Sequence, residues 1–183
     1  MEESNNPSPL TTAYQPWNKG KLIGAKPPLR SKHVWSIRTK LQIEGRKRDL
    51  ALFNLAIDRQ KKTGHPVRFE ISEQTRQALD EYMSAAGKQR GEFLFRGRKG
   101  CNRSLTTRQY ARLVSEWIAS CGLDPSLFGT HSLRRTKATM IYKRTGNLRA
   151  VQLLLGHTKI ESTVRYLGIE IDDALEIAEQ VDI

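Results

Sequence analysis

The sequence predicts a mainly α-helical domain that also contains a small β-hairpin or sheet. Over most of residues 32–168, apolar residues recur at the three- and four-residue intervals that are typical of amphipathic helices. Capping residues and glycines divide this stretch into several helices. One short segment, residues 67–71, instead alternates apolar and polar residues, as a strand with one buried face does. The 183-residue chain has the length of one ordinary domain.

The N-terminal residues 1–31 are rich in Pro, Asn, Ser and Lys. We therefore expect an extended arm that is largely without regular structure. Tyr14 and Trp17 are the large aromatic residues of this arm. Their rings would either anchor the arm on the domain, which we favour, or stack on a nucleic-acid base.

Residues 32–58 are expected to form two helices, with a break at Gly45 and the basic run 46–48. The apolar positions of these helices are Ile37, Leu41, Leu50, Phe53, Leu55 and Ile57. The alternating strand at 67–71 follows, and residues 62–64, Lys-Thr-Gly, would form the turn that leads into it.

Ser72 is expected to cap the next helix, which would stop near Gly87. The apolar residues at helical spacing in this segment are Leu79, Tyr82 and Met83. Residues 93–95, Phe-Leu-Phe, are a short apolar run that predicts a second strand.

A longer amphipathic helix is expected after Thr106, which forms a capping-box pair with Gln109, and it would end at Gly122. Its apolar face consists of Tyr110, Leu113, Val114, Trp117, Ile118 and Cys121. This spacing places Cys121 in the core.

Short helices are expected from Thr130 onward. Thr130 would cap the first, and Gly146 would end it. Asn147 would cap the second, over residues 148–155, and Gly156 would end that one.

A second capping box, Thr158 with Glu161, would open a helix that contains Val164 and Tyr166. Residues 172–173, Asp-Asp, would open a final helix with apolar positions at Leu175 and Ile177.

The composition excludes several classes of protein. Two cysteines, Cys101 and Cys121, are too few for a disulfide scaffold or a four-cysteine zinc site. No apolar run approaches the roughly 20 residues of a membrane-spanning helix. The first residues lack the basic and apolar regions of a signal peptide. We therefore expect a soluble protein of a reducing compartment.

The charge is unevenly distributed along the chain. The formal net charge is +12, yet residues 169–183 contain six acidic and no basic residues. Residues 1–168 therefore hold all 31 basic residues against 13 acidic ones. Such an excess attracts polyanions, so nucleic acid is the expected partner, while a solvated basic surface is the alternative.

Three short motifs in the C-terminal half together suggest phosphodiester chemistry. They are His131-Ser-Leu-Arg134, then Leu154-Leu-Gly-His157, then Tyr166 nine residues after His157. Each alone is most simply a helix cap, a core helix or a packing residue. Jointly they supply a phenol that can attack phosphorus and cationic or imidazole donors for the phosphate oxygens.

In this order and spacing, the motifs resemble the catalytic domain of the tyrosine recombinases, or phage integrases. The resemblance covers roughly residues 33–180 and is strongest over 129–168. It implies the helical fold with a sheet, of which part is missing here. The segment 61–67 also resembles the family's hairpin, in which the Lys before Thr-Gly is catalytic. This assigns Lys62, with Lys61 as the alternative.

The resemblance implies a role for each motif residue. Tyr166 would attack the scissile phosphate and form a 3′-phosphotyrosyl link, releasing a 5′-hydroxyl. Arg134 would hold the non-bridging oxygens, and His131 would help to accept the tyrosine proton. His157 would donate a hydrogen bond to the phosphate, and Lys62 would protonate the leaving oxygen. No cofactor is implied, and the sequence contains neither a Walker loop nor a metal-ligand cluster.

The chain departs from the family pattern before the hairpin. The family places a further catalytic arginine in a Leu-Arg motif after a helix that residues 49–58 resemble, but residues 59–63 already belong to the hairpin. The domain is thus shortened between residues 58 and 61, and Arg59 is a candidate substitute that we disfavour. Losing one oxyanion donor slows such reactions on the order of 10²–10³-fold. A catalytically impaired DNA-binding remnant or regulator is therefore the alternative to an active recombinase.

The expected organisation is an arm at 1–31, a catalytic domain at 32–168 and an acidic C-terminal helix at 169–183. That helix would contact another protomer or fold back on its own domain. The resemblance implies double-stranded DNA as partner, a dimer on each site, a tetramer in synapsis and a bacterial or phage cytoplasmic, nucleoid-associated location. An unrelated RNA-binding protein is disfavoured by the joint motif spacing. The additional candidate DNA contacts are Arg135, Lys137, Arg165, Lys61 and Arg108.

Overall fold

The computed structural model describes residues 26–59, 70–98 and 103–168. The first two helices are α1 (Ser31–Ile43) and α2 (Lys47–Asp58), so the expected division of residues 32–58 is confirmed. The break falls at Gly45, whose φ of +64° is a left-handed conformation that glycine adopts without strain.

The next two helices are α3 (Glu73–Ala85) and α4 (Thr107–Ser120). Ser72 is the N-cap of α3 as expected, but its hydroxyl makes no capping bond and instead donates to Asp58. The capping box that opens α4 is confirmed, because the Thr106 hydroxyl accepts from the backbone N–H of Gln109 at 3.2 Å.

The C-terminal helices are α5 (Thr130–Thr145), α6 (Leu148–Leu155) and α7 (Ile160–Leu167). Gly146 and Gly156 end α5 and α6 in the left-handed conformation, and the Asn147 side chain caps α6, all as expected.

Two expected helix starts are wrong. Thr130 is the first residue of α5, and Gly129 is its N-cap. The expected capping box of Thr158 with Glu161 is absent, because Lys159 is the N-cap of α7 and makes no side-chain capping bond. The expected final helix after residues 172–173 lies outside the part of the chain that the structure describes.

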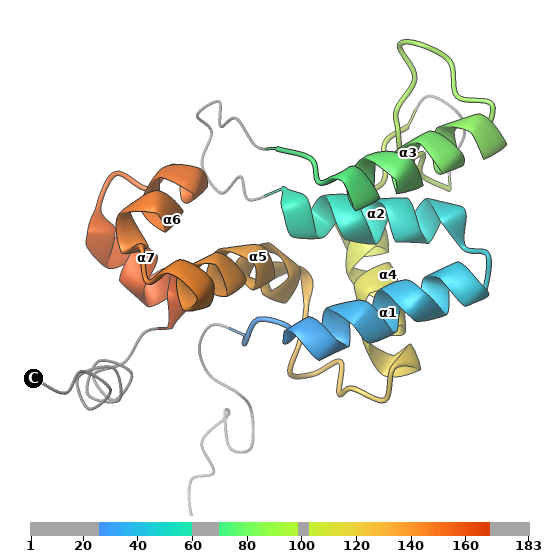
Figure 1. Cartoon of the computed structure of the whole chain (residues 1–183). Helices are drawn as coiled ribbons and strands as arrows, with labels where there is room; N and C mark the ends of the chain where they lie inside the picture. Colours follow the sequence, from blue (N-terminus) through green and yellow to red (C-terminus); the bar gives the residue numbers. More distant parts are fainter. Residues whose placement is uncertain (1–25, 60–69, 99–102, 169–183) are drawn as a thin grey trace, which may run out of the picture.

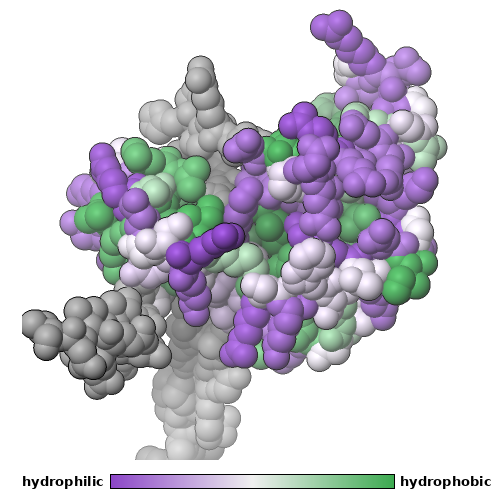
Figure 2. Space-filling model, viewed as in Figure 1, coloured by the Kyte–Doolittle hydropathy of each residue, from purple (hydrophilic) through white to green (hydrophobic). Residues whose placement is uncertain are grey.

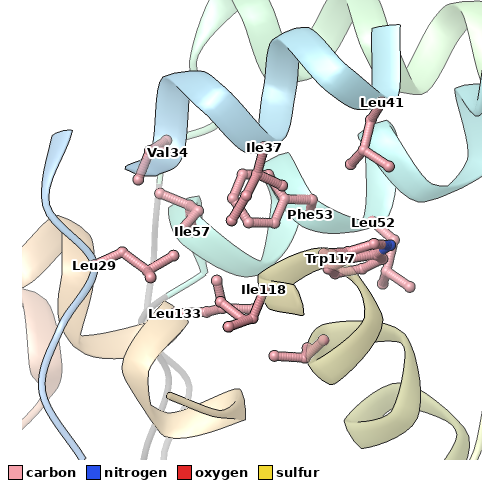
Figure 3. Close-up of a cluster of buried hydrophobic side chains, with 11 residues drawn as sticks. Leu29, Val34, Ile37, Leu41, Leu52, Phe53, Ile57, Trp117, Ile118 and Leu133 are labelled. Carbon is pink, nitrogen blue, oxygen red and sulfur yellow. The ribbon is translucent and has the colours of Figure 1, made fainter. Parts of the chain in front are cut away.

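The main hydrophobic core lies between α1, α2 and α4, and Leu29 and Leu133 complete it (Figure 3). The rings of Phe53 and Trp117 meet edge to face with 5.7 Å between their centroids, and neither side chain is exposed. Cys121 is only half-buried and packs at the edge of this core. Because Leu133 belongs to α5, the core also fixes the start of that helix.

A second apolar cluster joins α6 and α7 to α5. Figure 1 shows α6 and α7 together on one side of α5, with α1 to α4 on the other. The buried residues of this second cluster are Ala138, Val151, Leu155 and Leu167. In Figure 2, hydrophilic residues cover most of the visible surface of α1 to α4, whereas apolar residues gather over α6 and α7. The exposed large apolar side chains on those two helices are Leu153, Leu154 and Ile160.

The mainly α-helical fold class is confirmed, and the β-structure within the described ranges is one antiparallel bridge between Arg96 and Ser104. Residues 93–95 are not a strand, so that expectation is wrong. Phe95 instead stacks on Tyr82 of α3, with ring centroids 5.5 Å apart. Of the expected strand at 67–71, only the last two residues are described, and they are not in a strand.

A buried carboxylate at the end of α2 joins three helices. Asp58, the last residue of α2, is 3% exposed. It accepts hydrogen bonds from the backbone N–H and the hydroxyl of Ser72, at 2.9 and 2.8 Å. It also accepts from the Lys137 ammonium of α5 at 2.9 Å. Asp58 therefore brings the start of α3 to the end of α2 and fastens both to α5.

The electrostatic environment of Asp58 predicts acid-sensitive stability. Burial raises the pKa of Asp58, but hydrogen bonds from Thr75, Lys137 and Ser72 outweigh it and leave the pKa below its usual value. A depressed carboxyl pKa stabilises the fold above the unfolded-state value and loses this contribution as pH falls through the folded-state value. We expect the free energy of unfolding to decrease as the pH is lowered below about 4.

Replacing Asp58 by Asn should lower the free energy of unfolding at pH 7 by roughly 2–4 kcal/mol, because Lys137 loses its counter-charge. Chemical denaturation across pH 3–7 measures both effects. Asp80→Asn on the exposed face of α3 is the matched control. Equal stability and equal pH dependence in the two variants would contradict the role of Asp58.

None of the helices in the described ranges is long and apolar enough to cross a membrane.

Candidate active site

The N-terminal turn of α5 presents two of the expected site residues to solvent. His131 and Arg134 lie one helical turn apart, and both are exposed. They lie in the first turns of α5, where free backbone N–H groups and the helix dipole favour an anion. Arg134 is close enough to Tyr166 for its positive charge to lower the pKa of that phenol. The start of α5 can therefore bind a phosphate beside the expected nucleophile.

The turn between α6 and α7 fixes His157. Its backbone carbonyl accepts from the side-chain amide of Gln152 at 3.0 Å. Its ring Nδ1 lies 3.0 Å from the hydroxyl of Thr163, which is fully buried in α7. Gly156 turns the chain in the left-handed conformation just before it. The backbone of His157 is thus held from α6 and its ring from α7, as a group that must meet a substrate atom needs to be.

Tyr166 lies in the last turn of α7, half-buried against the cluster that joins α5, α6 and α7. The His157 ring meets the Tyr166 ring nearly at right angles, with 5.5 Å between centroids. The Arg135 guanidinium lies over the same ring, 5.7 Å from its centroid. The structure therefore brings His157, Tyr166 and the α5 arginines into one group.

Burial raises the pKa of the Tyr166 phenol, and the positive charges of Arg135 and Arg134 lower it, with burial the larger effect. The phenol is therefore protonated near pH 7, and a reaction at its oxygen needs a proton acceptor. Burial also raises the pKa of Tyr110 on α4 to about 12, against the opposing charge of Arg134.

The other expected site residues lie in different surroundings. Arg108 and Arg165 are exposed on α4 and α7. Lys137 is bound to Asp58, and Arg135 is 5% exposed and faces protein groups. Arg59 is exposed directly after α2. Lys61 and Lys62 lie outside the described ranges, and all these assignments stay predictions.

The sequence did not reveal two supports of the site. The Thr163 hydroxyl orients the His157 ring. Thr163 lies one helical turn before Tyr166, and this spacing was a usable signal that its hydroxyl faces the site. The Arg135 guanidinium lies over the Tyr166 ring. Arg135 shares a helix face with the buried residues Ser132 and Ala138, and this position could have indicated that its side chain is buried. Within the ranges the structure describes, no cluster of three or more His, Cys, Asp or Glu side chains could hold a metal ion.

Comparison with solved structures identifies the class of this fold. It matches the XerA recombinase with a TM-score of 0.68 at 16% identity, over 84% of this chain and 65% of that one. It matches XerH, in a complex described as bound to palindromic difH substrate, with a TM-score of 0.65 at 17% identity, over 84% of this chain and 53% of that one.

A family model described as the phage integrase family matches residues 28–170, and the chain belongs to that family. The probable integrase/recombinase YoeC of Bacillus subtilis is 31% identical over 113 residues, which are 62% of this chain. The tyrosine recombinase XerD of Xanthomonas campestris is 38% identical over 64 residues, which are 35% of this chain. These matches span 60% of YoeC and 20% of XerD. The resemblance in the sequence motifs is thus confirmed.

The packing beside Tyr166 predicts an unusual sensitivity at Gly168. This glycine ends α7 at a φ of +68°, and a Cβ there would lie 3.1 Å from Nη2 of Arg135. Gly168→Ala should lower the free energy of unfolding by about 1–2 kcal/mol from backbone strain, with a further loss from displaced Arg135. Thermal and urea unfolding measure the difference.

Gly146→Ala is the matched control, because Gly146 also ends a helix at positive φ but has nothing within 4 Å of its Cβ position. Gly168→Ala should be the more destabilising of the two. Equal losses would show that the Arg135 contact contributes nothing.

Proposed function

We propose that this chain is a site-specific DNA recombinase or integrase that cuts and rejoins DNA through a 3′-phosphotyrosine on Tyr166. The observation that carries the proposal is the grouping of Tyr166 with His157 and the positive charge of Arg134, from α7, the α6–α7 turn and α5. These are the residues that the family motifs assign to the reaction. Membership of the phage integrase family supports the same activity.

In the proposed reaction, the Tyr166 oxygen attacks phosphorus and the bond from phosphorus to the 5′-oxygen breaks. His131 helps to accept the phenol proton, which the raised pKa of Tyr166 makes necessary. Arg134 and His157 hold the non-bridging oxygens as charge develops on them. Lys62 protonates the leaving 5′-oxygen. The reverse attack by a 5′-hydroxyl restores the phosphodiester, so the bond energy is conserved throughout.

DNA contacts outside the reacting phosphate are assigned to basic side chains. Arg108 at the start of α4 and Arg165 beside Tyr166 are exposed and have no ion pair within the described part of the chain. Lys61 and Lys137 complete the proposed set, whereas the 5% exposure of Arg135 disfavours a direct contact from that residue. The Tn1549 transposon integrase, another structural neighbour with a TM-score of 0.64, was solved in complex with circular intermediate DNA. A DNA duplex is accordingly the proposed substrate.

Self-association follows the same proposal, with a dimer on each site and a tetramer in synapsis. Residues 1–31 would serve as an arm, residues 32–168 as the catalytic domain, and 169–183 as the segment that meets another protomer. The apolar side chains that α6 and α7 leave exposed support a contact at that end of the domain. Oligomeric assembly on bacterial or phage DNA is the setting in which this activity would operate.

A DNA-binding remnant is the second candidate function. The observation that favours it is in the sequence, where residues 59–63 lack the Leu-Arg motif of the family and leave Arg59 as a candidate substitute for its first arginine. Arg59 is exposed at the end of α2. Such a protein would bind duplex DNA through its basic surface without cutting it.

A covalent trapping assay separates the two functions. The protein is incubated with nicked duplexes that cover the DNA flanking its own gene, and the products are run on denaturing gels. We expect a protease-sensitive shifted band that disappears in Tyr166→Phe and falls roughly 10²–10³-fold in Arg134→Ala. Arg59→Ala then measures whether Arg59 substitutes for the missing arginine.

Arg76→Gln is the control for loss of one positive charge, since Arg76 is exposed on α3 and pairs only with Glu73 in the described structure. It should leave the band unchanged. Salt-sensitive binding to the same duplexes without any covalent band would make the chain a DNA-binding remnant and end the enzyme proposal.

A further inference from the structure

Arg135 is a buried cation that the proposed reaction does not use. Its side chain is 5% exposed, although its sequence neighbour Arg134 is exposed. Burying a guanidinium is unfavourable unless protein groups replace its water. The partners of Arg135 therefore show what the fold gains from placing it there.

Two other parts of the chain meet at the guanidinium. Its Nη1 donates to the backbone carbonyl of Lys26 at 2.7 Å. Its Cζ lies over the ring of Tyr166, and its Nη2 occupies space that a side chain at Gly168 would need. Its Nε is buried without a hydrogen-bond partner in the described part of the chain. The guanidinium thus joins α5 to both the N-terminal segment and the end of α7.

The N-terminal segment is itself fastened to α5, so it can hold Arg135 in place. The backbone N–H of Leu29 donates to the Thr136 hydroxyl at 3.0 Å in a buried bond. The Lys26 ammonium donates to the Phe128 carbonyl at 3.1 Å. Leu29 is 3% exposed and belongs to the main core. Lys26 therefore offers its carbonyl from a fixed position.

We propose that Arg135 is a positioning residue for the nucleophile: held by the Lys26 carbonyl, it fixes the Tyr166 ring and places a permanent positive charge beside the phenol. This inference rests on the proposed function of Tyr166. It assigns Arg135 a role through the tyrosine in place of a direct DNA contact, which its burial disfavours.

Within the described part of the chain, three other charged or titratable side chains lie near the Tyr166 phenol. Arg134 approaches from α5, His157 from the α6–α7 turn, and Arg165 precedes Tyr166 on its own helix. Burial is the main influence on the pKa of Tyr166 and raises it, and Arg135 is the first of the two charges that lower it. Removing the Arg135 charge should therefore make the phenol harder to ionise.

The position of Arg135 distinguishes its effect from that of a DNA-binding residue. A residue that contacts DNA phosphate changes affinity and the salt dependence of binding. A residue that holds Tyr166 changes the rate and pH dependence of cleavage at saturating DNA. Arg135 should show the second pattern.

The test compares Arg135→Gln and Arg135→Lys with Arg144→Gln, an exposed charge-matched control near the other end of α5. Full-length proteins are labelled with 3-fluorotyrosine, whose phenol ionises at lower pH than tyrosine. Fluorine NMR follows each titration, and Tyr166→Phe assigns the resonance. Single-turnover adduct formation and salt-dependent DNA binding are measured on the same proteins.

We expect Arg135→Gln to raise the titration midpoint of residue 166 by about one pH unit. Adduct formation should slow roughly 10- to 100-fold, with the salt dependence of DNA binding unchanged. Arg135→Lys should restore most of the midpoint but only part of the rate, because lysine keeps the charge and lacks the planar fork. Arg144→Gln should match the parent protein in all three measurements.

An unchanged midpoint in a folded Arg135→Gln protein would overturn the inference, as would a change confined to DNA affinity and its salt dependence. If Arg135→Gln fails to fold, Arg135→Lys tests the inference. A parental rate and a parental resonance position in that variant would overturn the positioning role of the planar guanidinium. If the parent protein forms no adduct, the proposed function fails, while the NMR titration still decides whether Arg135 sets the ionisation of Tyr166.

Discussion

The buried carboxylate of Asp58 is the interaction on which the rest of this helical fold depends. It joins the end of α2 to the start of α3 through Ser72, and it fastens that junction to α5 through Lys137. Because α5 carries His131, Arg134 and Arg135, the same carboxylate helps to fix the helix that bears the site. A charged junction of this kind is strong only while all its partners are in place.

The site divides between two structural supports. The core around Trp117 fixes the start of α5, and the cluster at Val151 and Leu155 joins α6 and α7 to the same helix. The imidazole and the phenol therefore come from a small helical unit that packs directly on the helix supplying the arginines.

Local rules in the sequence predicted much of this fold. Several of these features depend only on the backbone conformation of one residue or on one side-chain bond. They are the break at Gly45, the capping box of Thr106 with Gln109, and the glycines that end α5 and α6. The expected strand at residues 93–95 failed because an apolar run fits a strand and a packing loop equally well, and stacking of Phe95 on Tyr82 decided it.

The sequence could propose the candidate site as a set of residues but not as an arrangement. Motif spacing identified Tyr166, His157 and Arg134, since the family motifs lie in one continuous part of the chain. It could not show that Arg135 is buried while Arg134 is exposed, because adjacent arginines differ only in the helix face that tertiary packing buries. The bond from Lys137 to Asp58 spans 79 positions, and no local pattern encodes it.

The most direct test of the account is to identify the residue that carries DNA after trapping. Trypsin cuts after Lys159 and Arg165, and any resulting peptide that ends at Ile183 contains a single tyrosine, Tyr166. Mass spectrometry of the nuclease-trimmed adduct should find a nucleotide on that C-terminal peptide, with fragmentation placing it on Tyr166. A nucleotide on any other peptide would contradict the account.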